Sequence, residues 1–239
     1  MTRRLTRDEL AARIDHTLLT PEATTADVVR LCGEAIELQV GAVCVSPTMV
    51  AVARAGLPPN VTVCTVVGFP SGAHRPATKV AEAELALTEG AGELDMVVDL
   101  GATAAHDWQA VARDVAAVRA CAGVVLKIIV ESALWSPDEL DEVARVAVDA
   151  GADLLKTSTG FHPRGGASTV AVAALARVAA TAPPTRHGDA VGVKASGGIR
   201  DANAALAMLD AGATRLGCSA SRAILDGLDE AQRDTSPDA

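Results

Sequence analysis

Three of the four lysines in this chain lie inside apolar, strand-like segments. They are Lys127 in VVLKIIVE, Lys156 in ADLLKTSTG and Lys194 in VGVKASGGIR. Arginine supplies 17 of the 21 basic residues, so lysine at positions where burial is expected indicates chemistry that needs an amine. A guanidinium is always charged, whereas an ε-amine can become neutral and nucleophilic. The pattern predicts a covalent imine between one of these lysines and a carbonyl substrate.

A lysine must lose its proton before it can attack a carbonyl, and a free lysine is almost entirely protonated at neutral pH. Partial burial and a second ammonium group nearby both favour the neutral amine. Two lysines on neighbouring strands of a closed barrel would supply both effects. The alternative is that each lysine reaches water from a strand end or forms a structural ion pair. The polar, glycine-containing segments that follow Lys156 and Lys194 favour the chemical role.

Asp95 is the carboxylate that we expect beside these amines. It alternates with Leu94 and Met96 in ELDMVVD, so the period of two along a strand directs it away from them and toward the barrel interior. The same alternation directs the three lysines there. Because an uncompensated buried charge is costly, these groups should be paired or hydrated. Asp95 is then either an acid/base or water-orienting group beside an imine, or a structural counter-ion to a lysine.

The elements that must position these side chains are eight short apolar segments alternating with helical patterns. We expect strands at 13–17, 42–46, 61–67, 93–99, 124–130, 153–158, 190–195 and 214–218. Eight such units in 239 residues predict a single α/β domain, a (β/α)₈ TIM barrel over residues 1–239, with a polar, frayed tail from about residue 228. The alternative is an open, doubly wound sheet.

A weak internal repeat supports this spacing. Four helical patterns end at a glycine suited to a left-handed cap before an apolar run begins, at Gly41, Gly90, Gly151 and Gly212. Helix starts are expected at Thr20-Pro21 and at Ser136-Pro137, where Glu139 would complete a capping box.

Glycine-containing segments follow the last strands. In a (β/α)₈ barrel the site lies at the carboxyl ends of the strands, and loops near the last strands often bind phosphate through backbone N–H groups. Gly197 and Gly198, before a helix that opens near Asp201, and Gly217 with Ser219 have the chemistry for this. Together these loops predict a phosphate site, although each glycine alone could make an ordinary turn.

The composition narrows the choice of partners. A net charge of −9 and a pI near 5.0 disfavour nucleic acid and anionic membranes as partners. A second copy of the chain, in a homodimer, is the protein partner that we consider. The five cysteines form no CxxC pair and no signal peptide is evident, so we expect reduced thiols in a cytoplasmic protein. The five histidines show no HxH or HExxH spacing, so we expect no metal site, and the chain has no GxGxxG dinucleotide fingerprint.

These residues resemble a known family, the deoxyribose-phosphate aldolases, which are class I aldolases on a (β/α)₈ barrel. The resemblance runs from about residue 14 to residue 228. It is carried by IDHTLL, VCVSP, VVGFPSG, ELDMVVDLG, LKIIVE, DLLKTSTGF, VGVKASGGIR and RLGCS, among which KTSTGF and VKASGGIR are specific to the family.

The resemblance implies reversible cleavage of 2-deoxy-D-ribose 5-phosphate to acetaldehyde and D-glyceraldehyde 3-phosphate without a metal or organic cofactor. It assigns Lys156 as the imine-forming nucleophile, Lys194 as the neighbouring ammonium that favours its neutral form, and Asp95 as the group that shuttles protons with a water. The spacing itself does not say which lysine attacks. Phosphate-contacting positions match Gly160, Gly197, Gly198 and Ser219, and residues around the pocket match Lys127, Asp15 and Cys44.

Two departures from the family pattern affect the site. Phe161 follows KTSTG where some members have a basic residue, so the cationic partner of the phosphate is left open, with Arg164 as one choice. The chain has no tyrosine, which in some members assists proton transfer near the C-terminus. Two other functions remain open: an imine-forming aldolase with a different donor, and a catalytically silent barrel that binds a sugar phosphate.

Overall fold

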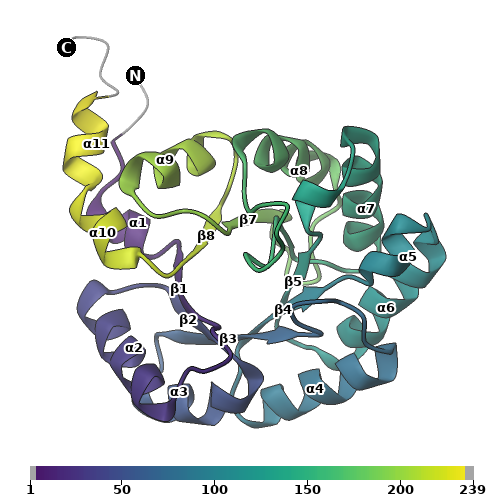
Figure 1. Cartoon of the computed structure of the whole chain (residues 1–239), viewed down its shortest axis with the longest axis horizontal. Coiled ribbons are helices and arrows are strands. Elements are labelled where there is room, and N and C mark those ends of the chain that lie inside the picture. The colour runs from purple at the N-terminus through teal and green to yellow at the C-terminus, as the bar shows by residue number, and fades with distance from the viewer. Residues whose placement is uncertain (1–3, 235–239) are drawn as a thin grey trace.

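The computed structural model describes residues 4–234, and in it eight parallel strands close into a barrel (Figure 1). The strands are β1 (Ile14–Leu18), β2 (Ala42–Val45), β3 (Thr62–Val67), β4 (Glu93–Val97), β5 (Val125–Ile129), β6 (Leu154–Lys156), β7 (Gly192–Ser196) and β8 (Arg215–Cys218). Each strand pairs with its neighbour in sequence, and β8 pairs with β1. The closed (β/α)₈ barrel is confirmed, and the open sheet is wrong because no strand of the barrel is left at an edge.

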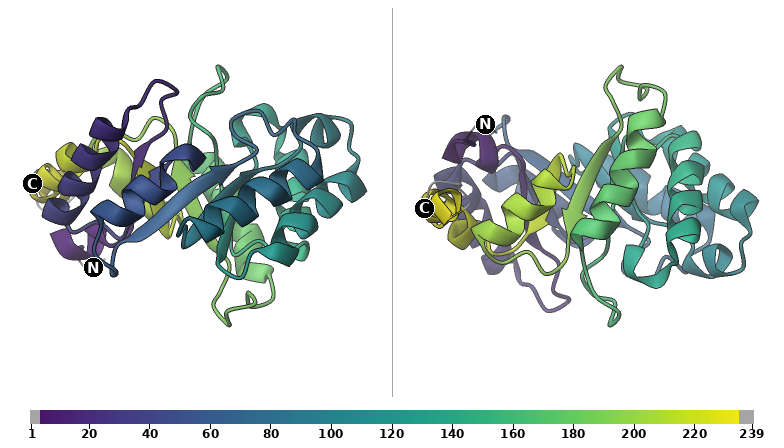
Figure 2. Two further views of the ribbon diagram at one scale, coloured as in Figure 1. Left: turned by 90° about the horizontal axis from the view of Figure 1, so that it is seen from below. Right: turned by 90° about the horizontal axis from the view of Figure 1, so that it is seen from above.

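Helices surround the barrel on all sides, as the two edge-on views also show (Figure 2). They are α1 (Arg7–Ala11), α2 (Thr25–Leu38), α3 (Val50–Gly56), α4 (Pro76–Thr88), α5 (Leu100–Ala104), α6 (Trp108–Cys121), α7 (Pro137–Asp149), α8 (Thr169–Thr181), α9 (Ala202–Asp210), α10 (Ser221–Asp226) and α11 (Leu228–Asp234), with 3₁₀ turns at Pro47–Met49 and Ser132–Leu134. At least one α-helix follows each strand. Among residues 4–234, no helix has both the length and the apolar character needed to cross a membrane.

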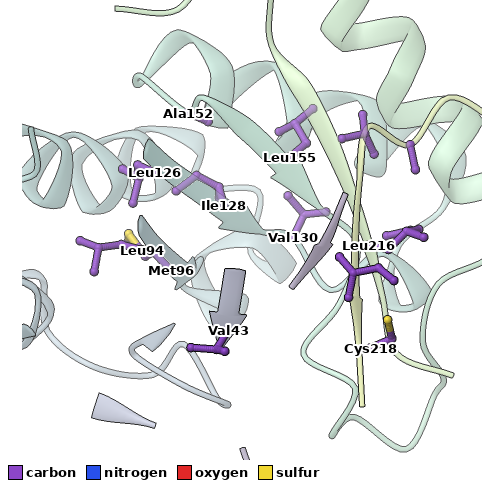
Figure 3. Close-up of a cluster of buried hydrophobic side chains, with 14 of the residues drawn as sticks. Val43, Leu94, Met96, Leu126, Ile128, Val130, Ala152, Leu155, Leu216 and Cys218 are labelled. Carbon is purple, nitrogen blue, oxygen red and sulfur yellow. The ribbon is translucent and has the colours of Figure 1, made fainter. Parts of the chain in front are cut away.

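The main hydrophobic core lies between the strands and the helices. Alternate strand residues such as Leu94, Met96, Leu126 and Ile128 point outward and are fully buried under the helices (Figure 3). Burying apolar surface there stabilises the fold by roughly 25 cal/mol per Å². The inward positions of the same strands can therefore carry polar side chains without removing the main apolar core.

The helix starts agree only in part with expectation. Ser136 caps α7, and Glu139 completes the capping box that the sequence predicts. The start expected at Thr20-Pro21 is wrong, because α2 begins at Thr25 with Thr24 as its cap. The reason is a competing capping box, in which Thr24 and Asp27 satisfy each other's backbone N–H groups. Residues 19–24 instead form the loop that follows β1.

The junction glycines serve two different purposes. Three have the left-handed backbone that the repeat predicts: Gly90, Gly151 and Gly212. Gly41 does not, because Gln39 takes the left-handed cap position of α2 with φ of 55°. A side chain on Gly41 would place Cβ 2.4 Å from the carbonyl oxygen of Ala12. Close backbone approach therefore requires this glycine.

The frayed tail expected from about residue 228 is wrong for the residues that the structure describes. Residues 228–234 form α11, in which Leu228 and Ala231 are buried. Gln232 exchanges hydrogen bonds with the backbone of Leu5, at 3.0 and 2.9 Å. A spacing of three places both apolar residues on one helix face, and α11 packs against α9 and α10. The rest of the expected tail, residues 235–239, lies outside the described residues.

Candidate active site

The barrel interior holds a carboxylate in contact with three lysines. Asp95 Oδ1 lies 2.8 Å from Lys127 Nζ, and Asp95 Oδ2 lies 2.6 Å from Lys156 Nζ and 2.7 Å from Lys194 Nζ. Strand register explains the convergence, because Asp95 pairs with Lys127 across β4 and β5, and Lys156 pairs with Lys194 across β6 and β7. The structure therefore brings together the four side chains that the alternation directs inward.

A second set of ion pairs surrounds this group. Asp15 on β1 pairs with Lys194, and its other oxygen lies 3.2 Å from Arg215 Nη1. Glu93 bridges Lys127 and Arg215, at 2.6 Å to each. The resemblance includes Asp15, but the sequence reasoning missed Glu93 and Arg215. The period of two along the strand could have indicated Glu93, because it lies two residues before Asp95 and so shares its face of β4.

The ion pairs fix most of the charges in this interior. Burial opposes ionisation of Asp95, but its contacts with the barrel lysines, chiefly Lys127, outweigh that effect and hold the pKa of Asp95 well below its usual value. Burial also opposes the charge of Lys194, yet Asp15 and Asp95 outweigh that effect and raise its pKa. The pKa of Lys127 is raised in the same way, chiefly by Asp95. Lys127 and Lys194 are therefore ammonium ions at neutral pH.

A pocket of about 280 Å³ opens at the carboxyl ends of the strands, above this cluster. Lys156 lines it and is 3 % exposed. The remaining cluster residues named by the sequence analysis have no exposed surface: Asp15, Cys44, Asp95, Lys127 and Lys194. Of the three barrel lysines, Lys156 is thus the one that a ligand in the pocket can reach, because β6 ends at this residue while the others lie deeper in their strands.

Residues expected to hold a phosphate line the same pocket. Gly160, Gly197, Gly198 and Ser219 are all among its walls. The three glycines have φ between 81° and 90°, a left-handed backbone that other residues rarely adopt. Their amides and carbonyls can therefore lie against a ligand where a side chain would intervene. The site thus combines a reachable amine at its base with a glycine-rich rim.

The loops after β6 and β7 are packed against each other. Ser196 Oγ donates to the carbonyl of Ser158 at 2.6 Å, and Ala167 N donates to the carbonyl of Gly197 at 3.0 Å. A Cβ added to Gly166 would lie only 2.3 Å from the Gly197 oxygen. These contacts hold two segments that are distant in sequence as one wall of the pocket.

The sequence reasoning missed two polar residues: Arg200, which lines the pocket, and Glu131, which hydrogen-bonds to a residue of the pocket wall. Arg200 lines the pocket, whereas Arg164, the cation that the sequence analysis considered, is not among the lining residues. Arg200 ends VKASGGIR, two residues after the glycine pair, and this position was the available signal. Glu131, at the end of LKIIVE, is buried and accepts a 2.7 Å hydrogen bond from Thr159 Oγ1. It holds the backbone between Lys156 and Gly160 in place.

The part of the interior formed by β2 and β3 is apolar. Cys44, Cys64, Leu19 and Val66 form a buried cluster, and Phe69 packs against it. Both thiols are free. A hydrogen bond to Cys64 lowers the pKa of Cys44, whereas burial raises the pKa of Cys64 well above its usual value. Cys44, which the resemblance places around the pocket, is a fully buried core residue beside the cluster.

Some of these side chains have the atom types of metal ligands. Cys44, Cys64 and Asp95 bring potential ligand atoms within 4.8 Å of one another, as do Asp15, Cys64 and Glu93. Every carboxylate in these sets already contacts a lysine or arginine. A metal cation placed there would be repelled by the same ammonium groups, so the residues present do not fit a cation site.

Comparisons with known proteins agree with this geometry. Residues 10–227 match the model of a family described as DeoC/LacD family aldolase. A deoxyribose-phosphate aldolase of Mycolicibacterium paratuberculosis is 58% identical over 93% of this chain and 98% of its own length, and one of Nocardia farcinica is 54% identical over 93% and 96%. A tetrameric deoxyribose phosphate aldolase from Aeropyrum pernix has a similar structure, with a TM-score of 0.82, 35% identity, and 94% and 92% of the two chains covered. The chain therefore belongs to the DeoC/LacD aldolase family.

Proposed function

We propose that this chain reversibly cleaves 2-deoxy-D-ribose 5-phosphate to acetaldehyde and D-glyceraldehyde 3-phosphate, with Lys156 as the imine-forming nucleophile. The names of its relatives support the substrate. The observation that carries the residue assignment is that Lys156 lines the pocket, while Lys127 and Lys194 are fully buried beneath it. An amine must reach the substrate carbonyl to add to it, so access favours Lys156.

The charges of the barrel suit an imine mechanism. The neutral amine of Lys156 adds to the substrate carbonyl, and loss of water gives an iminium whose positive charge accepts the electron pair when the C–C bond breaks. The resulting enamine must then take a proton on carbon. That proton comes from the hydroxyl of the departing aldehyde fragment, and Asp95, 2.6 Å from Lys156 Nζ, is close enough to hold the water that relays it.

The phosphate is proposed to bind at the opposite end of the pocket. Backbone N–H groups near Gly198 and Ser219 and the guanidinium of Arg200 would hold the dianion. Binding energy from this remote group would position the sugar chain over Lys156. Arg200 then takes the place of the basic residue that some relatives have directly after KTSTG.

Trapping with borohydride tests the nucleophile. Acetaldehyde followed by borohydride should leave a two-carbon adduct on Lys156, located by mass spectrometry of a proteolytic digest, and should inactivate the enzyme. The variant Lys156→Ala is the control and should show neither adduct nor turnover. An adduct on Lys127 or Lys194 would refute the assignment. Trapping by dihydroxyacetone phosphate or pyruvate in place of acetaldehyde would identify an aldolase with another donor.

Assembly and location remain proposals. The homodimer considered from the sequence can be tested by light scattering of the purified chain, where twice the mass of 24.2 kDa is the expected result. The cytoplasmic location can be tested by fractionating the source cells.

A further inference from the structure

Two charged residues at the amino ends of the strands belong to the ion-pair network but do not line the described pocket. Glu93 begins β4, and Arg215 begins β8. These strands lie opposite each other in the eight-stranded order, so the 2.6 Å ion pair between Arg215 Nη2 and Glu93 Oε1 crosses the barrel interior. Their side chains are only 20% and 9% exposed. They form the base of the network.

One chain of contacts leads from Arg215 to the reactive end of the barrel. Arg215 Nη1 lies 3.2 Å from Asp15 Oδ1, and the other oxygen of Asp15 pairs with Lys194. Lys194 Nζ in turn lies 2.7 Å from Asp95 Oδ2. Gly217 leaves room for this arrangement, because a Cβ there would lie 2.9 Å from Lys194 Cε.

A second chain of contacts starts at Glu93. Glu93 Oε2 lies 2.6 Å from Lys127 Nζ, which is 2.8 Å from Asp95 Oδ1. Both chains therefore end at the two oxygens of Asp95. Lys156 Nζ contacts Oδ2 of the same carboxylate. A change of charge at the base of the barrel is therefore linked to the Lys156 amine through one or two charged side chains and Asp95.

The charges of this network balance only when one amine is neutral. The ion pairs join four basic side chains to three carboxylates: Lys127, Lys156, Lys194 and Arg215 with Asp15, Glu93 and Asp95. With Lys156 neutral, the three other cations match the three carboxylates. A buried region with no net charge costs less than one with a surplus charge.

We propose that Arg215 and Glu93 are positioning residues that set the charge balance of the barrel interior and thereby the pH at which the Lys156 amine becomes neutral. This inference rests on the proposed role of Lys156 as the nucleophile. Loss of Arg215 would leave a surplus negative charge that favours the ammonium form of Lys156. Loss of Glu93 would leave a surplus positive charge that favours the neutral amine.

Each of the other seven strands also presents a charged or titratable group to this interior. The groups that share it with Lys156 are Asp15 on β1, Cys44 on β2, Cys64 on β3, Glu93 and Asp95 on β4, Lys127 on β5, Lys194 on β7 and Arg215 on β8, with Arg200 at the pocket rim. Burial opposes each charge, but the ion pairs lower the pKa of Asp15 and Asp95 and raise the pKa of Lys127 and Lys194. A single substitution at the base therefore leaves these four charges in place and changes the total by one unit.

The test compares the acid limb of kcat/KM against pH in four variants. In a buried site of effective dielectric constant about 20, a unit charge about 10 Å away shifts a titration by about one pH unit. We expect Arg215→Met to move the acid limb up by about one unit and Glu93→Gln to move it down by about one unit. The double variant should return near the wild-type position, and Arg215→Lys should stay there because the charge is kept.

A second readout reports on the free enzyme directly. The initial rate of borohydride trapping by acetaldehyde should show the same shifts in its pH dependence, because only the neutral amine reacts. The matched control is Arg119→Met, which removes a similarly shielded arginine paired with Asp153 at 2.7 Å but outside the barrel interior. Its acid limb should not move. Circular dichroism identifies the folded variants, and Glu93→Gln, which keeps the side-chain shape, provides the test if Arg215→Met does not fold.

Three results would overturn the inference: unmoved acid limbs in folded variants, shifts of the two single variants in the same direction, or a double variant that titrates like Arg215→Met. The proposed function can be judged separately. If the wild-type chain gave no adduct on Lys156, both proposals would fall, whereas trapping at Lys156 with unmoved acid limbs would remove only this one.

Discussion

Access to solvent distinguishes three chemically identical side chains in this barrel. Lys127, Lys156 and Lys194 all contact the carboxylate of Asp95, yet only Lys156 has any exposed surface, at 3%. The two sealed lysines are paired with further carboxylates and keep their charge. Their fixed charges are therefore available to influence Lys156, the proposed nucleophile, and substitutions of single residues can test that influence.

Lys194→Leu should move the acid limb of kcat/KM to higher pH, by about one to two units. Because Asp15 and Asp95 raise the pKa of Lys194, it is an ammonium ion throughout the working range, and its loss makes protonation of Lys156 easier. The measurement is the pH dependence of cleavage. An active variant with an unchanged acid limb would contradict this role.

A second buried lysine provides a matched control. Lys79 is also fully buried and lies 2.6 Å from Asp114, but on α4 outside the barrel interior. Lys79→Leu leaves a buried carboxylate without its partner and should lower the free energy of unfolding by about 3–5 kcal/mol. Under conditions where this variant is folded, the acid limb should stay at the wild-type position.

Ser219→Asp should raise KM for the phosphorylated substrate about tenfold, because a like charge would face the dianion. Ser219 lines the pocket beside the glycine-rich loops, and Lys156 is untouched by the change. KM for unphosphorylated 2-deoxyribose should change far less. Ser219→Asn is the control of similar size without charge, and equal losses on both substrates in Ser219→Asp would show that this residue does not contact phosphate.

At the scale of elements, the site depends on loops that two strands bring together. The segments after β6 and β7 exchange hydrogen bonds between Ser158 and Ser196, and their backbones touch where Gly166 meets Gly197. The contact between the two segments helps to keep each in shape, and Glu131 also holds the segment after β6. Changes in this contact should affect phosphate binding before they affect the chemistry.

Gly166→Ala tests this dependence. Its Cβ would lie 2.3 Å from the Gly197 carbonyl oxygen, so the loop must shift, at a cost of about 1–3 kcal/mol in stability. We expect a severalfold higher KM for the phosphorylated substrate while trapping by acetaldehyde persists. The control is Gly33→Ala in α2, where no atom lies within 4 Å of the added Cβ. That variant should gain about 0.5–1 kcal/mol in stability without any change in KM.

At the scale of the whole molecule, the barrel separates stability from chemistry. The outward faces of the strands pack against the helices in an apolar layer, while the inward faces carry the charges. Because the outer layer stabilises the closed sheet, the interior can hold ion pairs that contribute little to folding. The same arrangement concentrates positive charge around the carboxylates of the interior.

This charge arrangement predicts activity without a metal ion. The carboxylates that could serve as ligands already contact ammonium or guanidinium groups, and an iminium can supply the positive charge that the carbanion needs. Cleavage activity should therefore survive exhaustive treatment with EDTA, measured after removal of the chelator. Loss of activity that zinc restores would indicate a metal-dependent aldolase mechanism.

Much of this architecture could be read from the sequence because it depends on local periodicity. Alternation along a strand is a property of the backbone, so ELDMVVD and LLKTS directed Asp95 and Lys156 inward before any tertiary contact was known. All eight strands were placed within two residues, including the short polar segment of β1. Residue types then suggested the chemistry, since amines in apolar strands are unusual.

The tertiary structure decided what depends on the ends of elements and on contacts across the barrel. The early end of β6 exposes Lys156, whereas Lys127 and Lys194 are covered, a difference in depth that spacing does not carry. The ion pair of Glu93 with Arg215 joins residues 122 positions apart, and their meeting requires a closed barrel. The start of α2 at Thr25 is different in kind, because the capping box of Thr24 and Asp27 that displaces the helix expected at Thr20 is itself local in sequence. Local preference sets which way a side chain points, and closure of the barrel sets what it meets.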